Sequence, residues 1–570
     1  MTLENSIALP GAGASTRKTV RNRIRWAALL LTLCFAAIGG RLVQLASVVT
    51  ETTIEGQERS IVTASRPELL DRNGLQLALD LRVPSLFAEP RRIVDVEEAV
   101  NNLTAVLPDL DAADLRRKLA TDKGFVWVKR ELTPAIQDRI MALGLPGIDF
   151  ISESRRFYPG GPEMSHVLGT VNIDNQGISG IEKYLDSQAD VALLQDLGLA
   201  RGNDLAPVTL SLDLRVQHAM REELVDALSR YQAIAAAGVM LDARTGEVLA
   251  LVSLPDFDPN VPSSALAEGR LNRISAGTFE LGSTFKTVTF AAALDSGKVT
   301  LLDQFDARFG VRFGRFTIED FHGKNRILSV PEVYKYSSNV GTIHIEQTLG
   351  KEAFREFLSR MHFDTTLSTE LPESAAPKVP PAFSEIVAAT ASFGHGISVT
   401  PLQMAAAMAA FVNGGLYRKP TFFPRSTEDA KAVAERVIAP ETSDRIRYLM
   451  RLNARAGSGT RMNKIADGYR AGGKTGTAEK VLNGRYQANT NLNAFASAFP
   501  LDDPKYVMVI LVDEPKAENP QSGTTAGWNA GEVAGRIIRR SAPMLGVAPD
   551  FDPDLDQTLI PPELVGRPDA

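Results

Sequence analysis

A single long apolar run stands near the start of the chain. Residues 26–40 form a stretch without a charge, and after Arg41 the apolar pattern continues to Ala46. A helix over residues 26–40 spans only about 22 Å of a hydrocarbon core of about 30 Å, but a snorkelling Arg41 makes a span of residues 24–46 feasible. The pattern therefore predicts a transmembrane anchor over residues 24–46. A cleaved signal peptide is the alternative, although Ala46-Ser47-Val48 is a poor cleavage site.

After the anchor, residues 47–205 alternate short β-like runs with polar helices. Residues 66–74 predict a strand that ends in an Asn-Gly turn. Two amphipathic helices are predicted over 96–107 and 112–119, separated at Pro108, because proline breaks a helix. This part shows no catalytic cluster, so the sequence favours a spacer or an interaction module.

From residue 206 to residue 547, the pattern is that of a long mixed α/β domain. A helix is predicted over about 213–229, and alternating apolar positions predict a hairpin over 238–253. Residues 400–412 predict a buried helix, and residues 505–513 predict a buried strand.

The N-terminal segment of the chain is basic, whereas the rest of the chain is acidic. Residues 1–41 carry six Lys and Arg residues and one acid, whereas the remaining chain carries 56 bases and 67 acids. By the positive-inside rule, residues 1–23 are predicted to be a cytoplasmic tail, with everything from about residue 47 outside the cytoplasm. Residues 548–570 hold five prolines and six acids, which predicts a disordered tail.

The composition excludes several classes of protein. At 570 residues, with 44% hydrophobic and 23% charged residues, the chain is an ordinary globular protein of several domains and not a polytopic membrane protein. Its net charge of -6 argues against a strongly basic nucleic-acid binder. Cys34 is the single cysteine, and no two of the six histidines are four residues apart, so the sequence offers neither a cysteine zinc site nor an HExxH helix.

Residues 468–475 read Gly-Tyr-Arg-Ala-Gly-Gly-Lys-Thr and match the P-loop pattern of nucleotide hydrolases. A P-loop needs a buried strand before its first glycine and a helix that starts at its Lys-Thr pair, since the helix N-terminus binds phosphate. Here residues 461–467 are largely polar, and Gly476 stands where the helix should propagate. The predicted topology also places Lys474 outside the cytoplasm. A strand over 474–482 is the better interpretation.

Three short motifs support a different chemistry for Lys474. Ser283-Thr-Phe-Lys286 opens an apolar helix, where residues i and i+3 share one face, so the lysine amine can reach the serine hydroxyl. A serine nucleophile needs a nearby base, and a lysine can serve if burial and neighbouring positive charge lower its pKa. Ser337-Ser-Asn339 and Lys474-Thr-Gly476 follow along the chain. Each motif alone is weak, but the ordered set beyond a membrane anchor is specific for penicillin-binding proteins and β-lactamases.

With these motifs, the chain resembles class B penicillin-binding proteins, and most closely the members that act in cell division. The similarity covers nearly the whole chain, including residues 66–74 and 155–182 of what would be the pedestal domain, residues 47–205. Transpeptidase motifs follow at 282–286, 337–340, 393–403 and 473–478, and segments at 512–516 and 526–529 favour the division enzyme over the elongation one. Leu281 departs from the proline that is common before Gly-Ser, but it carries no chemistry.

The resemblance implies a serine acyltransferase fold, with a five-stranded antiparallel sheet and helices on both sides, after an elongated α+β pedestal or dimerisation-type domain. It implies that Ser283 attacks the carbonyl between two D-alanines of a stem peptide, and that Lys286 takes its proton and helps to return it to the leaving amine. Ser337 would relay protons. Asn339 would orient Lys286 and the substrate amide.

The strand motif would supply the rest of the site. The resemblance implies that Lys474 contributes positive charge, while Thr475 and Thr477 hold the terminal carboxylate. The backbone N–H groups of Ser283 and Thr477 would form the oxyanion hole. Gly476 would leave room for substrate backbone along that strand. No cofactor and no metal are implied.

The function implied is peptidoglycan D,D-transpeptidation in septal cell-wall synthesis, by an enzyme of the inner membrane with its bulk in the periplasm. Its substrates would be stem peptides of lipid-II-derived strands, its inhibitors β-lactams, and its partners a SEDS-type glycosyltransferase and other division proteins. A hydrolase with the same Ser-Lys pair is one alternative, although a simple hydrolase has no evident need for residues 47–205. A β-lactam sensor or non-catalytic scaffold is the other, and the intact Ser283, Lys286, Asn339 and Lys474 argue against it.

Overall fold

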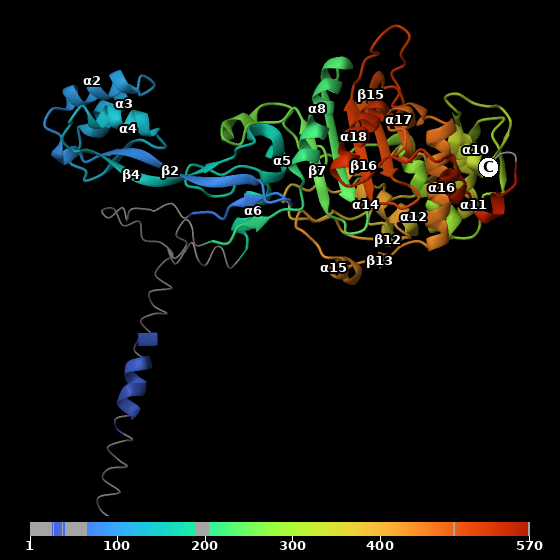
Figure 1. Ribbon diagram of the computed structural model, residues 1–570, viewed down its shortest axis with the longest axis horizontal. Helices are drawn as coiled ribbons and strands as arrows, with labels where there is room; N and C mark the ends of the chain where they lie inside the picture. Colours follow the sequence, from blue (N-terminus) through green and yellow to red (C-terminus); the bar gives the residue numbers. More distant parts are fainter. Residues whose placement is uncertain are drawn as a thin grey trace, which may run out of the picture. The chain divides into compact units, whose positions relative to one another are not determined.

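The computed structural model describes residues 26, 28–36, 38–39, 65–188, 205–482 and 485–567 (Figure 1). The chain divides into two units, Met1–Ile61 and Val62–Ala570. In the first unit, the described residues between 26 and 39 are helical and exposed. None of the helices in the described ranges has both the length and the apolar character that a bilayer span requires. Much of the predicted 24–46 anchor lies outside the described residues, so the anchor stays a prediction.

The second unit begins with an α+β domain whose sheet is built on two long strands. Asp95, Asp111 and Thr133 cap its three main helices by accepting backbone N–H groups. Two of these helices lie where the sequence predicts them, at 96–107 and 112–119. The strands are β1 (Leu69–Leu70), β2 (Gln76–Ala88), β3 (Val126–Lys129), β4 (Ile148–Phe157) and β5 (Val208–Thr209), and the helices are α2 (Val96–Val106), α3 (Ala112–Leu119), α4 (Pro134–Met141), α5 (Ser165–Leu168) and α6 (Gly180–Asp186).

The strand predicted over 66–74 is much shorter in the structure. β1 has two residues, because the Asp71 carboxylate accepts the backbone N–H groups of Asn73 and Leu75, at 2.8 and 2.9 Å, and closes a turn. Gly74 completes this turn with a φ of +84°, a conformation that favours glycine. The predicted turn is therefore confirmed, but the strand before it ends at Leu70.

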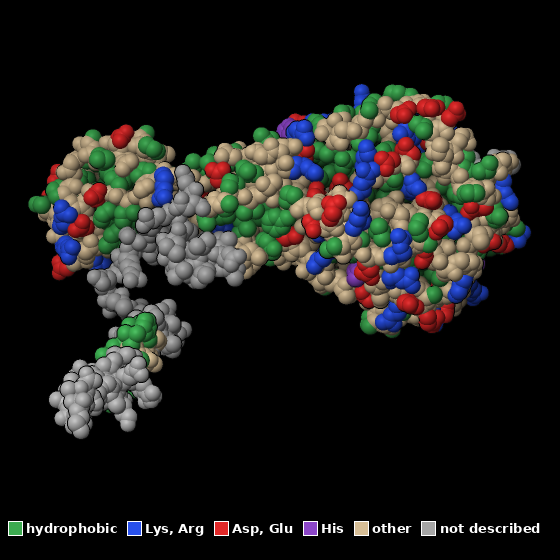
Figure 2. Space-filling model, turned by 60° about the horizontal axis from the view of Figure 1, so that its bottom comes forward, with side chains coloured by type: hydrophobic (Ala, Val, Ile, Leu, Met, Phe, Trp, Pro, Cys, Tyr) green, Lys and Arg blue, Asp and Glu red, His purple; other side chains and the backbone are tan. Residues whose placement is uncertain are grey.

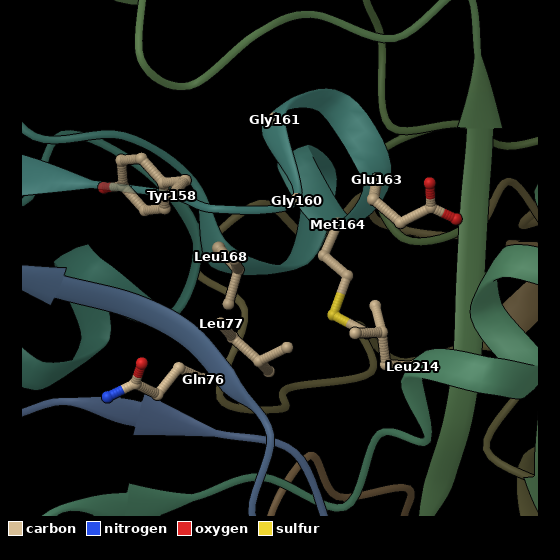
Figure 3. A pocket seen from close by; sticks show the side chains of 9 residues that line it. All are labelled: Gln76, Leu77, Tyr158, Gly160, Gly161, Glu163, Met164, Leu168 and Leu214. Atoms are coloured by element: carbon tan, nitrogen blue, oxygen red, sulfur yellow. The ribbon is translucent and has the colours of Figure 1, made fainter.

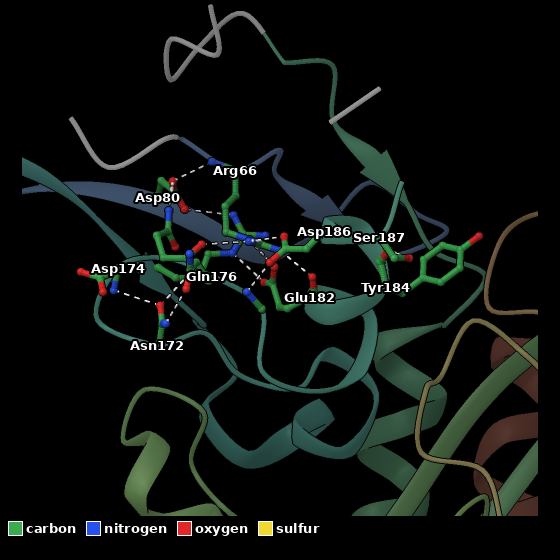
Figure 4. Close-up of polar contacts among 12 residues, drawn as sticks. Arg66, Asp80, Asn172, Asp174, Gln176, Glu182, Tyr184, Asp186 and Ser187 are labelled. Carbon is green, nitrogen blue, oxygen red and sulfur yellow. Dashed lines mark hydrogen bonds and ion pairs between the residues drawn. The ribbon is translucent and has the colours of Figure 1, made fainter. Parts of the chain in front are cut away.

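A buried cluster of charges ties β2 and β4 to α6 (Figure 4). Arg66 and Arg156 each donate from Nε to one oxygen of Glu182, both at 2.7 Å, and Arg156 also donates to Asp80 at 3.1 Å. Burial alone would raise the pKa of Glu182, but the two guanidinium groups hold that pKa below its ordinary value. Glu182 is fully buried and is the shared partner of two buried cations.

The next domain is organised around a five-stranded antiparallel sheet in the order β14-β15-β16-β6-β7. Along β16, alternate side chains enter two different hydrophobic clusters, one on each face of the sheet. This explains why residues 505–513 are apolar at nearly every position, and it confirms the predicted strand and the predicted hairpin at 238–253. The strands are β6 (Ala235–Asp242), β7 (Val248–Leu254), β14 (Gly472–Leu482), β15 (Arg485–Phe499) and β16 (Tyr506–Asp513).

Helices cover both faces of this sheet, as the family resemblance implies (Figure 1). One face carries α8 (Leu214–Arg230) and α18 (Ala530–Met544), and the other carries α9 (Lys286–Asp295), α14 (Pro401–Val412) and α16 (Pro440–Ala456). The predicted helices at 213–229 and 400–412 are thereby confirmed.

On the face of the domain that Figure 2 shows, acidic and basic side chains are interspersed. The remaining elements are α10 (Val330–Tyr336), α11 (Asn339–Leu349), α12 (Lys351–Arg360), α13 (Glu385–Ser392), α15 (Thr427–Ala432), α17 (Thr460–Ile465), β8 (Gln304–Asp306), β9 (Val311–Phe313), β10 (Phe316–Ile318), β11 (Ile327–Ser329), β12 (Leu416–Tyr417) and β13 (Glu435–Arg436).

The predicted disorder of residues 548–570 is wrong for the part that the structure describes, which ends at residue 567. Two short 3-10 helices, Pro553–Leu559 and Pro562–Leu564, lie against the domain, and Leu559 and Leu564 are buried in its main core. Arg451 of α16 donates to both carboxylate oxygens of Asp556, at 2.7 and 3.0 Å. The prolines and acids suggested an unfolded tail. The two buried leucines and the ion pair instead keep the tail packed against the domain.

The α+β domain packs directly on the sheet domain. Gln217 of α8 donates to the Glu163 carbonyl at 2.8 Å, and Asn260 exchanges hydrogen bonds with the backbone of Tyr158. A small pocket lies at this junction, lined mainly by apolar side chains such as Leu77, Met164 and Leu214 (Figure 3). Glu163 is its one charged lining residue, so the pocket offers no catalytic cluster.

Candidate active site

The candidate nucleophile lies where a 3-10 turn meets an α-helix. Gly282–Phe285 forms the turn, and α9 continues from Lys286. Ser283 is half-buried. Gly282 has a φ of +51°, and a Cβ added there would lie 2.8 Å from the Thr477 carbonyl oxygen and 3.1 Å from the Thr477 nitrogen. The glycine therefore lets the serine turn approach the backbone of β14 closely at Thr477.

The amine of Lys286 is fully buried and makes three hydrogen bonds. It donates to the Ser337 carbonyl at 2.5 Å, to the Ser337 hydroxyl at 3.1 Å and to Asn339 Oδ1 at 2.7 Å. Ser337 ends α10 in the left-handed region, with a φ of +58°, which is uncommon for a residue with a side chain. This strained position presents both its carbonyl and its hydroxyl to one lysine.

A second buried lysine reaches the same hydroxyl from the sheet. Lys474 of β14 donates to the Ser337 hydroxyl at 2.9 Å, and its amine lies 5.9 Å from the centroid of the Tyr334 ring. Burial lowers the pKa of Lys474 to about 7. Burial, and then the charge of Lys474, hold the pKa of Lys286 well below its ordinary value. The lowered pKa makes it easier for Lys286 to give up its proton, as a lysine that acts as a base must do.

The two lysines and the Ser337 hydroxyl are joined by hydrogen bonds. Ser337 can accept a hydrogen bond from protonated Lys474 while its own hydrogen points to neutral Lys286. Lys286 takes its position three residues after Ser283, which lies on the same face of the turn. The structure thus brings together four of the predicted residues, Lys286, Ser337, Asn339 and Lys474, by direct hydrogen bonds.

Asp320 is a residue at this site that the sequence did not reveal. It follows β10, and its carboxylate accepts the hydroxyl of Ser338 at 2.7 Å, together with the backbone N–H groups of Asn339 and Val340. It therefore anchors the first turn of α11, from which Asn339 reaches Lys286. Its charge also acts to raise the pKa of Lys286, against the larger effects of burial and Lys474. No motif marks Asp320, because it stands 18 positions before Ser338, with β11 and α10 between them.

We expect Asp320→Asn to slow acylation by benzylpenicillin about tenfold, because the amide holds the first turn of α11 less firmly. The loss of a negative charge also lowers the pKa of Lys286 further, so the acid limb of the pH–rate profile moves to lower pH. The measurement is the second-order acylation rate between pH 5 and 9. The control is Asp306→Asn, which removes an exposed carboxylate paired with Arg308 from the same chain segment between α9 and α10. It should change neither the acylation rate nor the position of the acid limb. An unshifted acid limb in Asp320→Asn would contradict this role.

The hydroxyls of Thr475 and Thr477 on β14 form hydrogen bonds with other residues of the protein. The hydroxyls of Thr475 and Ser458 lie 2.6 Å apart, and Ser458 is bound in turn to Asn453, which also donates to the Gly473 carbonyl. The hydroxyl of Thr477 accepts the N–H of Ala526 at 3.1 Å, which leaves its hydrogen available to donate. Ser458 carried no sequence signal, and Ala526 stood out only as the start of the 526–529 segment.

The backbone of the chain itself places a constraint on Gly476 that the sequence did not reveal. A Cβ at this position would lie 2.1 Å from the carbonyl oxygen of Leu281, in the segment that leads into the nucleophile turn. The glycine is thus required by the chain's own backbone, whereas the sequence suggested room for a substrate. The structure also rules out a P-loop at residues 468–475. Lys474 and Thr475 lie inside the strand β14 and not at the start of a helix, and the helix α17, not a buried strand, precedes this segment.

The comparisons with known proteins decide the family. Residues 236–539 match the family described as the penicillin binding protein transpeptidase domain, and residues 61–189 match the penicillin-binding protein dimerisation domain. The chain belongs to the penicillin-binding-protein transpeptidases. Residues 65–188 are therefore called the pedestal domain from here on, and the sheet domain is called the transpeptidase domain.

The relatives agree along almost the full length of this penicillin-binding protein. It is 36% identical to a probable peptidoglycan D,D-transpeptidase FtsI from Caulobacter vibrioides, with 85% of this chain and 82% of the relative covered. It is 30% identical to the peptidoglycan D,D-transpeptidase FtsI of Escherichia coli K12, with 93% and 95% covered. A crystal structure of a peptidoglycan synthetase from Bifidobacterium adolescentis shares the fold, with a TM-score of 0.64, 22% identity, and 85% and 96% of the two chains covered.

Glu280, three residues before Ser283, has its carboxylate engaged elsewhere. It accepts the N–H of Gly396 at 3.1 Å and the hydroxyl of Tyr486 at 3.2 Å, and so joins the nucleophile segment to the 393–399 loop and to β15. Burial raises its pKa. Within the described ranges, no group of three or more His, Cys, Asp or Glu residues could hold a metal ion.

Proposed function

We propose that this penicillin-binding protein cross-links stem peptides during septal wall synthesis, with Ser283 as the nucleophile and Lys286 as its base. The observation that carries the proposal is the pair of buried lysines that share the Ser337 hydroxyl beside the serine turn. Such a pair lowers the pKa of the inner amine, which is what a lysine needs to act as a base at neutral pH. The protein is a serine-type D-Ala-D-Ala transpeptidase by its family and its relatives.

In the first half-reaction, Ser283 Oγ attacks the carbonyl between the two D-alanines while its proton passes to Lys286. The N–H groups of Ser283 and Thr477 would stabilise the oxyanion, since the turn that carries Ser283 approaches Thr477 at Gly282. The C–N bond then breaks, and the proton returns through Lys286 and Ser337 to the leaving D-alanine amine. An ester on Ser283 remains.

In the second half-reaction, the amine of another stem peptide attacks that ester. Lys286 and Ser337 would take its proton, and the Ser283 hydroxyl is regenerated as the new amide forms. Asn339, held on α11 by Asp320, would orient Lys286 and the substrate amide. Lys474, Thr475 and Thr477 would bind the terminal carboxylate of the donor, since Thr477 keeps its hydroxyl hydrogen free to donate.

The fate of the acyl-enzyme separates this function from hydrolysis. A hydrolase needs a base that holds a water against the ester, whereas Glu280, the nearest carboxylate in sequence, is bound to Gly396 and Tyr486. We therefore expect the penicilloyl adduct to persist far longer than one catalytic turnover. Intact-protein mass spectrometry after a drug chase measures this. Rapid loss of the adduct, with an excess of hydrolysed drug, would make the protein a hydrolase.

The membrane anchor at residues 24–46 and the location of the bulk of the chain in the periplasm belong to the same proposal. They are supported by the uncharged run 26–40 and by the excess of positive charge over positions 1–41. A reporter that is active only in the periplasm, fused after Ala570, should be active. A reporter that is active only in the cytoplasm should be silent, and the opposite result would contradict this topology.

A SEDS-type glycosyltransferase and other division proteins are the proposed partners, through the anchor and the pedestal domain. The pedestal domain supports this because residues 65–188 hold no catalytic residue and yet are tied firmly together by the Glu182 cluster. The measurement is copurification of the full chain with the polymerase. Equal recovery after exchange of the anchor and pedestal domain for those of an elongation enzyme would contradict a specific contact.

A further inference from the structure

The chain between α9 and α10 builds a small module at the edge of the active site. Residues 304–329 form two antiparallel pairs, β8 with β11 and β9 with β10. Val311, Phe313 and Ile318 of the β9–β10 hairpin pack on a small cluster that includes Ile343 of α11 and Phe393. Asp320 follows this hairpin directly and binds α11. The module is therefore fixed to two walls of the site, α11 and the 393–399 loop.

The same module exposes aromatic rings to solvent. Phe309, Phe316 and Phe321 are 75%, 55% and 79% exposed, although a phenylalanine is ordinarily buried. The three exposed rings stand within 13 positions of one another in one short module. Clustered exposed apolar side chains on a soluble domain mark a binding surface.

Positive charge accompanies these rings. Residues 304–329 hold five Lys and Arg residues and three acids, whereas the rest of the chain has 57 bases and 65 acids. Asp306 is paired with Arg308. Arg315 lies over the ring of Phe316, with 5.2 Å to the centroid, and Lys324 lies over the ring of Tyr336 at 4.8 Å. The module thus presents cations and flat apolar faces together on an otherwise acidic protein.

We propose that residues 307–328 are a docking surface for the nascent peptidoglycan strand, and that they bind the carboxylates of its stem peptides and the faces of its sugars. This inference rests on the proposed function. Stem peptides carry free carboxylates, which Arg and Lys side chains recognise, and sugar rings have apolar faces that pack on aromatic side chains. The attachment to α11 and to the 393–399 loop places a bound strand next to Ser283, where one of its stem peptides must enter.

The test measures strand binding apart from catalysis. The probe is a fluorescent, soluble, uncross-linked glycan strand that bears pentapeptide stems, and its anisotropy is followed with the full chain in detergent. All proteins carry Ser283→Ala, so that no turnover occurs. The test variant is Arg315→Gln with Lys324→Gln. The matched control is Arg139→Gln with Arg539→Gln, which removes the same charge from exposed positions on α4 and α18.

We expect the test variant to bind the strand about tenfold more weakly than the control, with a smaller dependence on salt. A strand without stem peptides should not distinguish the two variants. Phe309→Ser with Phe321→Ser should weaken the binding of both strands. With Ser283 intact, all variants should keep their rate of acylation by benzylpenicillin, which verifies the fold and the proposed nucleophile separately.

Equal strand affinity in test and control variants would overturn the docking surface while leaving the enzyme's function untouched. Loss of binding to a purified division protein, with strand affinity unchanged, would overturn it as well, because the surface would then be a protein interface. If benzylpenicillin failed to acylate Ser283 in the unmodified chain, the proposed function itself would be wrong.

Discussion

Lys286→Arg is expected to reduce acylation by β-lactams about a thousandfold. The buried Lys286 amine has a pKa held well below its ordinary value by burial and by Lys474, so it can lose and regain a proton. A guanidinium has a pKa above about 12 and cannot do so, although it keeps the positive charge. General base catalysis contributes on the order of 10² to 10⁴ in rate, which sets the size of the effect. Stopped-flow acylation with a chromogenic cephalosporin measures it.

Two further variants show whether the loss is one of chemistry. Lys286→Met fills nearly the same space without a base and should be as slow as Lys286→Arg. Lys298→Arg lies in the exposed turn after α9, where Lys298 donates to the Leu349 carbonyl, and should acylate normally. Near-normal acylation by Lys286→Arg would mean that Lys286 acts only through its charge and that another group is the base.

Glu182→Gln is expected to destabilise the pedestal domain by about 3–5 kcal/mol, the cost of breaking a buried ion pair from one side. Glu182 has no exposed surface and accepts from Arg66 and Arg156, so the substitution removes the carboxylate that these two buried guanidinium groups share. Arg66 then keeps only Asp186 as an ion-pair partner, and Arg156 keeps only Asp80. Because the pKa of Glu182 is lowered in the folded protein, its contribution is present above the unfolded pKa and is lost as the pH falls through the folded pKa.

The measurement is urea denaturation of the full chain, followed by the fluorescence of Trp127 on β3 in the pedestal domain. Asp174→Asn is the matched control, since Asp174 is also paired with an arginine, Arg130, but its side chain is 56% exposed. An exposed pair contributes less than about 1 kcal/mol. A loss in Glu182→Gln no greater than that in the control would show that the cluster does not stabilise the domain.

Local patterns predicted the parts of the fold that depend on nearby residues. The helix at 112–119 is set by its Asp111 cap and the strand at 505–513 by an unbroken apolar run, and both lie where expected. The prediction of a disordered tail was wrong because the prolines and acids of the tail outnumber the two leucines whose burial fixes its position. Burial of Leu559 and Leu564 depends on a surface that is distant in sequence, and no local pattern describes it.

The same limit applies to the candidate site. The motifs predicted Ser283, Lys286, Ser337, Asn339 and Lys474, because each stands in a short segment with a recognisable pattern. Asp320 was missed because it acts through backbone N–H groups of residues that lie 19 and 20 positions further along the chain. A second constraint on Gly476 was missed for a related reason, since the atom that excludes a side chain there belongs to Leu281.

The central claim is that Ser283 becomes acylated with Lys286 as its base, and peptide mapping tests it most directly. The full chain is treated with fluorescent penicillin, digested with trypsin and analysed by mass spectrometry, beside Ser283→Ala and Ser337→Ala. We predict one adduct, on Ser283, which is absent in Ser283→Ala and slower to form but still present on Ser283 in Ser337→Ala. An adduct on Ser337 or any other residue of the unmodified protein, or undiminished labelling of Ser283→Ala, would contradict the mechanism.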